Sequence, residues 1–154
     1  MIVIITFLGH SNFIPTTEIK KEILEQLEKK IGEQKVVFYL GGYGNFDNFA
    51  LQCCKEYKKQ HNNATIIFIT PYINNWLNER KEYFQREYDE ILYPDIEGTP
   101  LKYAILKRNE WMVEKSDFII AFVTMKFGGA YKALLHAKRK NKEFVNLTKS
   151  SKLN

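Results

Sequence analysis

Cysteine, glycine and proline are scarce in this chain of 154 residues, which contains 2 Cys, 8 Gly and 4 Pro. The two cysteines, Cys53 and Cys54, are adjacent, so they provide neither a disulfide framework nor the ligand spacing of a metal site. Reduced thiols inside the cell are the simplest interpretation. No cluster of metal ligands, no close pair of carboxylates and no Ser/His/Asp order is evident, and we expect neither a metal nor a cofactor.

A long apolar run is also missing. The most apolar stretch, residues 1–8, has no basic start and is too short for a signal peptide or a transmembrane span. We therefore expect a cytoplasmic protein without a membrane partner. Aromatic residues make up 14% of the chain, which excludes a disordered protein, and the length suits one domain over residues 1–154.

The charge is basic but dispersed. Lysine and arginine outnumber aspartate and glutamate by 23 to 18, which gives a net charge of +5. The densest basic run, residues 138–142, is interpreted as a solvated helix end, with a polyanion-binding patch as the alternative. Because no basic groove with interleaved aromatics can be read from the sequence, nucleic acid is the least favoured partner.

Continuous apolar runs predict strands that are buried on both faces, as in a parallel sheet. These runs lie at 2–8, 36–40, 66–69, 118–123 and 144–147, with a short further strand at 91–93. Helical patterns alternate with them. Their alternation predicts the α/β class: a three-layer Rossmann-like open sheet, mostly parallel, with helices on both faces.

The predicted helices have recognisable boundaries. The first begins at Thr17 as N-cap and stops at Gly32, and a later one opens with Thr99 as cap and Pro100 at its first position. Other helical stripes cover 50–57 and 130–137. Residues 72–98 are the least regular part, with a helix around 78–88, and are considered as a lid or an insertion.

Glycine is concentrated where predicted strands end. In an open α/β sheet, ligands bind at the carboxyl ends of the strands, and glycine followed by a helix N-terminus suits a phosphate. One such loop indicates only a tight turn, whereas three favour a phosphate-bearing ligand. The loops match neither the P-loop nor the dinucleotide pattern. The candidate binding residues in them are Gly9, His10, Ser11, Gly41, Gly42, Tyr43, Gly44, Gly128 and Gly129.

Arg108 lies within an apolar helical stripe, where an unpaired guanidinium would be unfavourable. It either reaches water or pairs with a carboxylate such as Asp117, or it binds a ligand phosphate with Asn109 beside it. Asp47 either caps its helix or contacts a ribose hydroxyl. His10 is either a simple hydrogen-bonding group or an acid–base catalyst. The apolar members of the stripe are Leu101, Ala104, Ile105, Trp111 and Met112.

Three segments together resemble the SLOG superfamily of Rossmann-like proteins. They are Arg-Asn-Glu-Trp-Met at 108–112, Ser-Asp-Phe-Ile-Ile-Ala at 116–121 and Gly128-Gly129. The superfamily includes the LOG-type ("lysine decarboxylase-like") phosphoribohydrolases and the DprA/Smf DNA-processing proteins. The resemblance covers most of residues 2–147 and implies a nucleotide site formed by Arg108 and the double glycine, and a homodimer.

The LOG pattern places a catalytic glutamate after its double glycine, at the position that is Leu135 here. Leucine cannot accept a proton, so the resemblance favours a sensor or module that binds a nucleotide or a nucleotide-derived small molecule. The alternative is an N-glycosidic hydrolase, or an enzyme similar to nucleoside deoxyribosyltransferases. That alternative needs a carboxylate from elsewhere, and the candidates are Asp47, Glu79, Glu82, Glu87 and Asp89.

Overall fold

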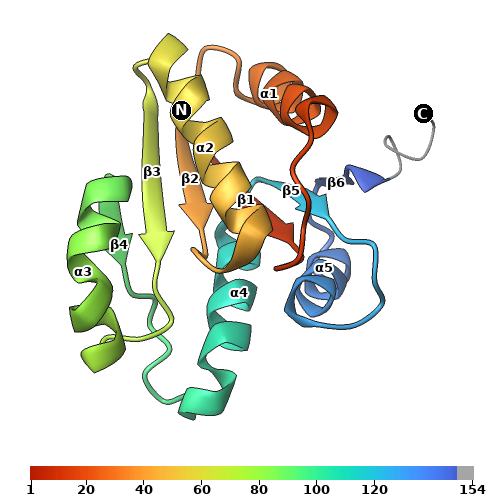
Figure 1. Cartoon of the computed structure of the whole chain (residues 1–154). Coiled ribbons are helices and arrows are strands. Elements are labelled where there is room, and N and C mark those ends of the chain that lie inside the picture. The colour runs from red at the N-terminus through yellow and green to blue at the C-terminus, as the bar shows by residue number, and fades with distance from the viewer. Residues whose placement is uncertain (149–154) are drawn as a thin grey trace.

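A computed structural model describes residues 1–148, which form a six-stranded parallel sheet between two layers of helices (Figure 1). The strand order is β4-β3-β2-β1-β5-β6. The predicted α/β Rossmann-like class is confirmed, and every neighbouring pair of strands is parallel. Residues 149–154 of the predicted domain lie outside the described residues. The strands are β1 (Ile2–Gly9), β2 (Lys35–Leu40), β3 (Ala64–Ile69), β4 (Glu90–Leu92), β5 (Phe118–Phe122) and β6 (Phe144–Asn146).

The helices divide between the two faces of the sheet. Side chains that alternate along β1 face opposite ways: Ile5 and Phe7 join the core beneath α1, α2 and α3, whereas Leu8 packs with α4 and α5. This division follows from right-handed crossovers in both directions from β1. The helices are α1 (Thr17–Ile31), α2 (Gly44–Gln60), α3 (Asn75–Glu87), α4 (Ala104–Lys115) and α5 (Gly129–Arg139).

Two predicted helix starts are wrong, that of α1 by one residue and that of α4 by about one turn. The cap of α1 is Thr16 rather than Thr17, because the Thr16 Oγ1 accepts the N–H of Ile19 at 3.1 Å. The helix that follows Pro100 begins as a 3₁₀ turn over Leu101–Tyr103, and α4 starts only at Ala104. The predicted end of α1 at Gly32, with its positive φ of 58°, is confirmed.

Most of the segment 72–98 forms regular structure. The helix expected around 78–88 is α3, which begins earlier, at Asn75, because the side chain of Asn74 accepts the N–H of Trp76 at 3.1 Å. The short strand expected at 91–93 is β4, and it pairs with β3. This unit therefore adds the outermost strand on one side of the sheet. Within residues 1–148, no helix is long and apolar enough to cross a membrane.

Candidate functional site

A cleft of about 620 Å³ opens at the carboxyl ends of β1 and β5. The strand order reverses between these two neighbours, since β2, β3 and β4 lie on one side of β1 and β5 and β6 on the other. Such a switch point is where open α/β sheets bind ligands. Loops after β1 and β5 and the early turns of α2, α4 and α5 line the cleft.

The fold gathers most of the predicted site residues at this cleft. Gly41 and Gly42 line an adjoining compartment instead, and Gly44 lines neither. The predicted residues that line the cleft are Gly9, His10, Ser11, Tyr43, Asp47, Arg108, Asn109, Gly128 and Gly129. Lining residues that were not predicted include Asn12, Ile105, Met112, Met125 and Phe127.

The N-terminus of α5 meets the cleft with open space in front of it. Gly128 has a φ of +93°, and a Cβ added there would have no atom within 4 Å. A Cβ on Gly129 would meet only the Asn109 Nδ2, at 3.9 Å. No side chain among the described residues caps this helix. Free N–H groups and the positive end of the helix dipole therefore face the cleft, which favours an anion.

Two other glycines have packing reasons. A Cβ on Gly9 would overlap the ring of Phe46, so a glycine is needed for α2 to lie against the end of β1. Gly44 has a φ of +87°, and its Cβ would lie 2.6 Å from the Cα of Ser11. The N–H of Asn45 also donates to the carbonyl of Ser11 at 2.9 Å. These glycines hold the loops after β1 and β2 together, and they do not by themselves indicate a ligand.

The guanidinium of Arg108 is buried at the junction of α4 with the ends of β2 and β3. The residue is 2% exposed, and its Nη1 donates to the carbonyls of Gly41 at 3.0 Å and Ile69 at 2.6 Å. Its Nε donates to the Asn109 Oδ1 at 2.9 Å. Burial lowers the pKa of Arg108 to about 10, and the nearby Asp47 carboxylate partly opposes this shift.

The suggested pairing of Arg108 with Asp117 is wrong. The Asp117 Oδ2 accepts the N–H of Ile4 at 2.8 Å, at the start of β5 and beyond the far end of α4. The predicted stripe is inward at Ala104, Arg108 and Met112, but Leu101 and Ile105 are exposed, at 67% and 39%. Carbonyl oxygens at strand ends, rather than a carboxylate, thus hold this cation.

Asp47 is the only carboxylate among residues 1–148 that lines the cleft. Its Oδ2 accepts the N–H of Tyr43, the residue that precedes α2, at 2.9 Å, so the carboxylate supports the start of that helix. Burial raises the pKa of Asp47 to about 6, against the opposing effects of this hydrogen bond and of Arg108. Within residues 1–148 the other carboxylate oxygen, Oδ1, accepts no hydrogen bond, which leaves it for a ligand hydroxyl.

His10 connects two loops at the switch point. The residue is 8% exposed, and its Nε2 accepts the N–H groups of Thr124 at 2.9 Å and Met125 at 3.2 Å. A ring that accepts at Nε2 is neutral and carries its proton on Nδ1. Burial lowers the pKa of His10, which favours this neutral form. The geometry supports the hydrogen-bonding interpretation of His10.

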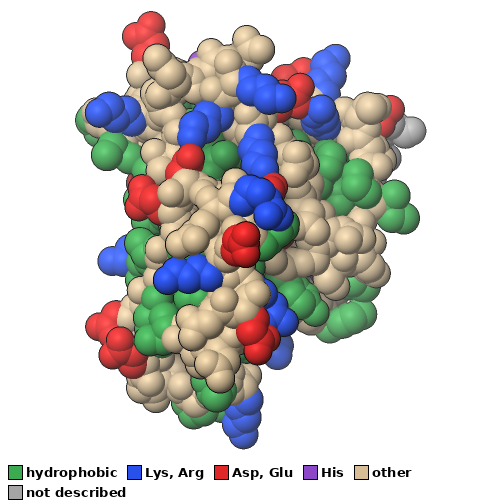
Figure 2. All heavy atoms as spheres, turned by 60° about the vertical axis from the view of Figure 1, so that its left-hand side comes forward, with side chains coloured by type: hydrophobic (Ala, Val, Ile, Leu, Met, Phe, Trp, Pro, Cys, Tyr) green, Lys and Arg blue, Asp and Glu red, His purple; other side chains and the backbone are tan. Residues whose placement is uncertain are grey.

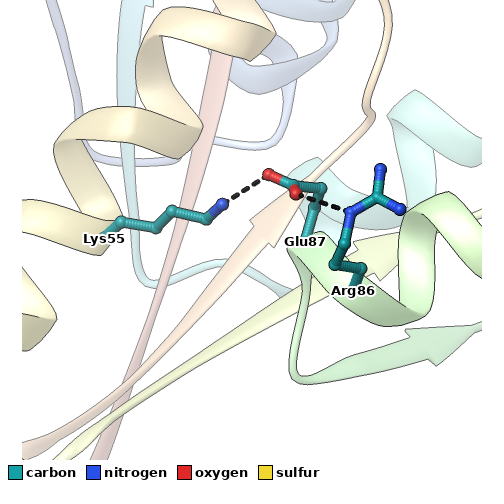
Figure 3. Close-up of polar contacts among 3 residues, drawn as sticks. All are labelled: Lys55, Arg86 and Glu87. Carbon is teal, nitrogen blue, oxygen red and sulfur yellow. Dashed lines mark hydrogen bonds and ion pairs between the residues drawn. The ribbon is translucent and has the colours of Figure 1, made fainter.

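The other carboxylates considered for hydrolysis lie away from the cleft. Glu87 accepts the Lys55 Nζ at 2.6 Å and the Arg86 Nε at 3.4 Å, which joins α3 to α2 (Figure 3). Asp89 pairs with Lys58 at 2.7 Å. Within residues 1–148, no group of three or more His, Cys, Asp or Glu is placed to hold a metal ion. None of Glu79, Glu82, Glu87 and Asp89 lines the cleft.

A second, apolar compartment of about 370 Å³ adjoins the cleft at the carboxyl ends of β2 and β3. The two share Tyr43, Ile105 and Arg108 as lining residues. Sequence reasoning missed the aromatic part of this compartment because it lies in the irregular segment after β3. The sequence offered one indication of this compartment: β3 ends just before Thr70, and ligands bind beyond the carboxyl ends of such strands. The remaining lining residues are Gly41, Gly42, Pro71, Tyr72, Asn74, Trp76 and Leu101.

The surface charge is mixed on the face that carries α3. Figure 2 shows lysine and arginine side chains interspersed with aspartate and glutamate across this face. Several of these charges are paired between helices, as in Lys20 with Glu56 and Lys55 with Glu87. This face therefore offers no continuous surface of one sign to a nucleic acid backbone.

No family model and no curated protein matches the chain, but solved structures do. DNA processing protein A (DprA) from Streptococcus pneumoniae aligns with 92% of this chain and 49% of its own, at a TM-score of 0.60 and 13% identity. DprA from Helicobacter pylori, described for its single-stranded DNA binding mode, aligns with 92% of this chain and 63% of its own. The TM-score is 0.59 and the sequence identity 20%. TM1055, a structural genomics target, aligns with 92% of this chain and 72% of its own, with a TM-score of 0.58 and 16% sequence identity.

At these identities the likeness is one of fold. The chain has the Rossmann-like fold of DprA and TM1055, which confirms at the level of fold the structure that the SLOG resemblance implies. It spans about half of the Streptococcus pneumoniae protein and less than two thirds of the Helicobacter pylori protein.

Proposed function

We propose that this chain binds a nucleotide or a nucleotide-derived small molecule in the switch-point cleft, and acts as a sensor or ligand-binding module. The observation that carries the proposal is the uncapped N-terminus of α5, which faces open space beside the buried guanidinium of Arg108. Both groups favour a negative charge, and both line one cleft.

The phosphate of such a ligand would lie against the first N–H groups of α5. Gly129 leaves room there, because the atom nearest to its absent side chain is the Asn109 Nδ2. Arg108 donates to the Asn109 Oδ1, and this hydrogen bond fixes the amide with its Nδ2 near Gly129. The Nδ2 can therefore donate to a ligand in the cleft. Asp47 also lines the cleft and would accept a sugar hydroxyl, and Ser11 adds a hydroxyl side chain to the polar lining.

The proposal is tested by unfolding the protein in the presence of AMP, cyclic AMP, ADP-ribose and ribose 5-phosphate, with sodium phosphate and adenosine as controls. A ligand at about 100 times its dissociation constant stabilises the native state by roughly 2.7 kcal/mol. We expect such a shift for at least one nucleotide and a smaller one for phosphate alone. No shift with any of the four compounds would refute the proposal.

A second candidate function is N-glycosidic cleavage or base exchange, and Asp47 is the observation that favours it. It is the one carboxylate that the described part of the chain places in the cleft, and a pKa of about 6 suits an acid–base group that works near neutral pH. Incubation with nucleoside monophosphates and chromatography for free base tests this function. Base release that persists in the Asp47→Asn variant would exclude Asp47 as the catalytic group.

Nucleic acid remains the least favoured partner in our proposal, and self-association as a homodimer rests on the family resemblance alone. A single-stranded oligonucleotide titrated at low and moderate salt tests for nucleic acid binding, since binding to the phosphate backbone weakens steeply with salt. Sedimentation of the protein alone measures the oligomeric state.

A further inference from the structure

We propose that the apolar compartment at the ends of β2 and β3 is the subsite for the planar base of the ligand, and that Tyr43 is its stacking residue. This inference rests on the proposed function and adds the orientation of the ligand to it. The anionic end would lie at α5, and the base would lie between Tyr43, Tyr72 and Trp76, on the opposite side of Arg108.

The two compartments differ in chemical character. The cleft contains Ser11, Asn12, Asp47 and Asn109 together with the α5 N-terminus, and therefore suits charged and hydroxylated groups. The adjoining compartment is lined mainly by glycine, proline, aromatic and aliphatic residues. A nucleotide has the same division, with a polar sugar phosphate and a flat, weakly hydrated base. Because the compartments share lining residues, one molecule can occupy both.

Tyr43 is placed for stacking. It lines both compartments and is 66% exposed, and its ring contacts no other aromatic ring among residues 1–148. Its backbone N–H donates to Asp47, which fixes the residue at the start of α2 while the ring stays free. Trp76, by contrast, has the Arg80 guanidinium 4.8 Å from its ring centroid and a T-shaped contact with Tyr72, with ring centroids 5.2 Å apart. The rings of Tyr72 and Trp76 both line the compartment but are already in contact with other side chains.

Phe127 offers the competing position for a base. It is 67% exposed and lines the cleft, but not the apolar compartment. A base against Phe127 would lie on the same side as the α5 N-terminus, among the polar groups of the cleft. The apolar compartment would then be left empty, so the two aromatic residues define two opposite orientations that mutation can separate.

The test measures the affinities of AMP and ribose 5-phosphate for the wild type and for Tyr43→Ala, Tyr43→Phe and Phe127→Ala. Base–aromatic stacking makes a contribution that corresponds to a loss of about tenfold or more in AMP affinity for Tyr43→Ala. We expect ribose 5-phosphate binding to stay within about twofold in that variant, because the sugar phosphate has no base to stack. Tyr43→Phe keeps the ring and should retain most of the AMP affinity, whereas Phe127→Ala should change the AMP and ribose 5-phosphate affinities by the same factor, because no base lies against Phe127.

Each other outcome overturns a distinct statement. A loss of AMP affinity in Phe127→Ala but not in Tyr43→Ala places the base in the cleft and overturns the inference alone. An equal loss of both ligands in Tyr43→Ala also overturns it, since Tyr43 would then act on the sugar phosphate. If the wild type binds neither ligand, nor any compound of the panel above, the proposed function fails, and the inference fails with it.

Tryptophan fluorescence provides a second readout, because the chain has only 2 Trp. Trp76 lines the apolar compartment, whereas Trp111 stacks on Tyr39 and lines neither compartment. In a Trp111→Phe variant, we expect AMP to change the emission and ribose 5-phosphate to leave it unchanged. Emission that responds equally to both ligands would contradict a base at Trp76.

Discussion

Replacing Arg108 with methionine should destabilise the fold even without a ligand. The variant removes the donor that serves the carbonyls of Gly41 and Ile69, at 3.0 and 2.6 Å, where the side chain is 2% exposed. A buried acceptor left without a partner costs about 1–3 kcal/mol. Methionine fills a similar volume and avoids the cost of burying a charge, which the lowered pKa of about 10 reveals.

The balance of these effects predicts a loss of about 2–4 kcal/mol in the free energy of unfolding. Urea unfolding followed by far-UV circular dichroism measures it, and the midpoint should fall by about 1–2 M. Arg108→Lys keeps a charged donor, so its urea midpoint should lie between those of the wild type and Arg108→Met. Lys107→Met is the matched control on the same helix, since Lys107 is exposed and forms an ion pair with Glu110 at 3.4 Å on the helix surface. Its effect on the free energy of unfolding should be below about 0.5 kcal/mol.

An Arg108→Met midpoint equal to that of the wild type would refute this reasoning. It would mean that the strand-end carbonyls find other partners, and that Arg108 is needed only when a ligand is bound. A midpoint that falls equally in Lys107→Met would show instead that α4 is sensitive to any substitution.

Substitutions at three further positions, Asp47, His10 and Gly9, test the electrostatics and packing around the cleft. The wild type should lose stability as pH rises from about 4 through 6, because the raised pKa of Asp47 keeps this carboxyl protonated to higher pH in the folded than in the unfolded state. Asp47→Asn should remove this loss. Urea midpoints over that pH range measure the effect, and a variant whose midpoints change with pH as those of the wild type do would contradict it. For His10, burial lowers the pKa, so the wild type should lose stability as pH falls below about 6.5. His10→Gln should keep the acceptor and abolish this loss, whereas His10→Ala should cost about 1–3 kcal/mol at neutral pH, and equal stability of the two would refute the role of the ring nitrogen. Gly9→Ala should destabilise by about 1–3 kcal/mol through its overlap with Phe46, and a wild-type urea midpoint would show that the helix shifts freely.

The sheet was predictable because its strands are buried on both faces. Runs such as Ile2–Leu8 have no polar alternation, and that pattern together with the intervening helices defines an open α/β sheet. The end of α1 at Gly32 was equally predictable, because a glycine with positive φ commonly ends a helix. The start of α4 was not, because Pro100 is as compatible with a 3₁₀ turn as with the first turn of an α-helix.

Several glycines predicted from the sequence line the cleft, but the sequence does not show why each position is a glycine. Gly9 lies at the predicted strand end because Phe46 packs over it, whereas Gly128 and Gly129 face open space. Only three-dimensional contacts distinguish a glycine required for packing from one that leaves room for a ligand. The partners of Arg108 were also beyond prediction, since backbone carbonyls at strand ends carry no residue-type signal.

The most direct test of the binding site compares Gly129→Val with Gly98→Val by calorimetric titration of AMP. Both glycines have open space around the added side chain, but only Gly129 lines the cleft, beside the α5 N-terminus. An anion seated on that N-terminus predicts that Gly129→Val loses about 100-fold or more in affinity, while Gly98→Val binds like the wild type. AMP binding by Gly129→Val with wild-type affinity would contradict the placement of the ligand in this cleft.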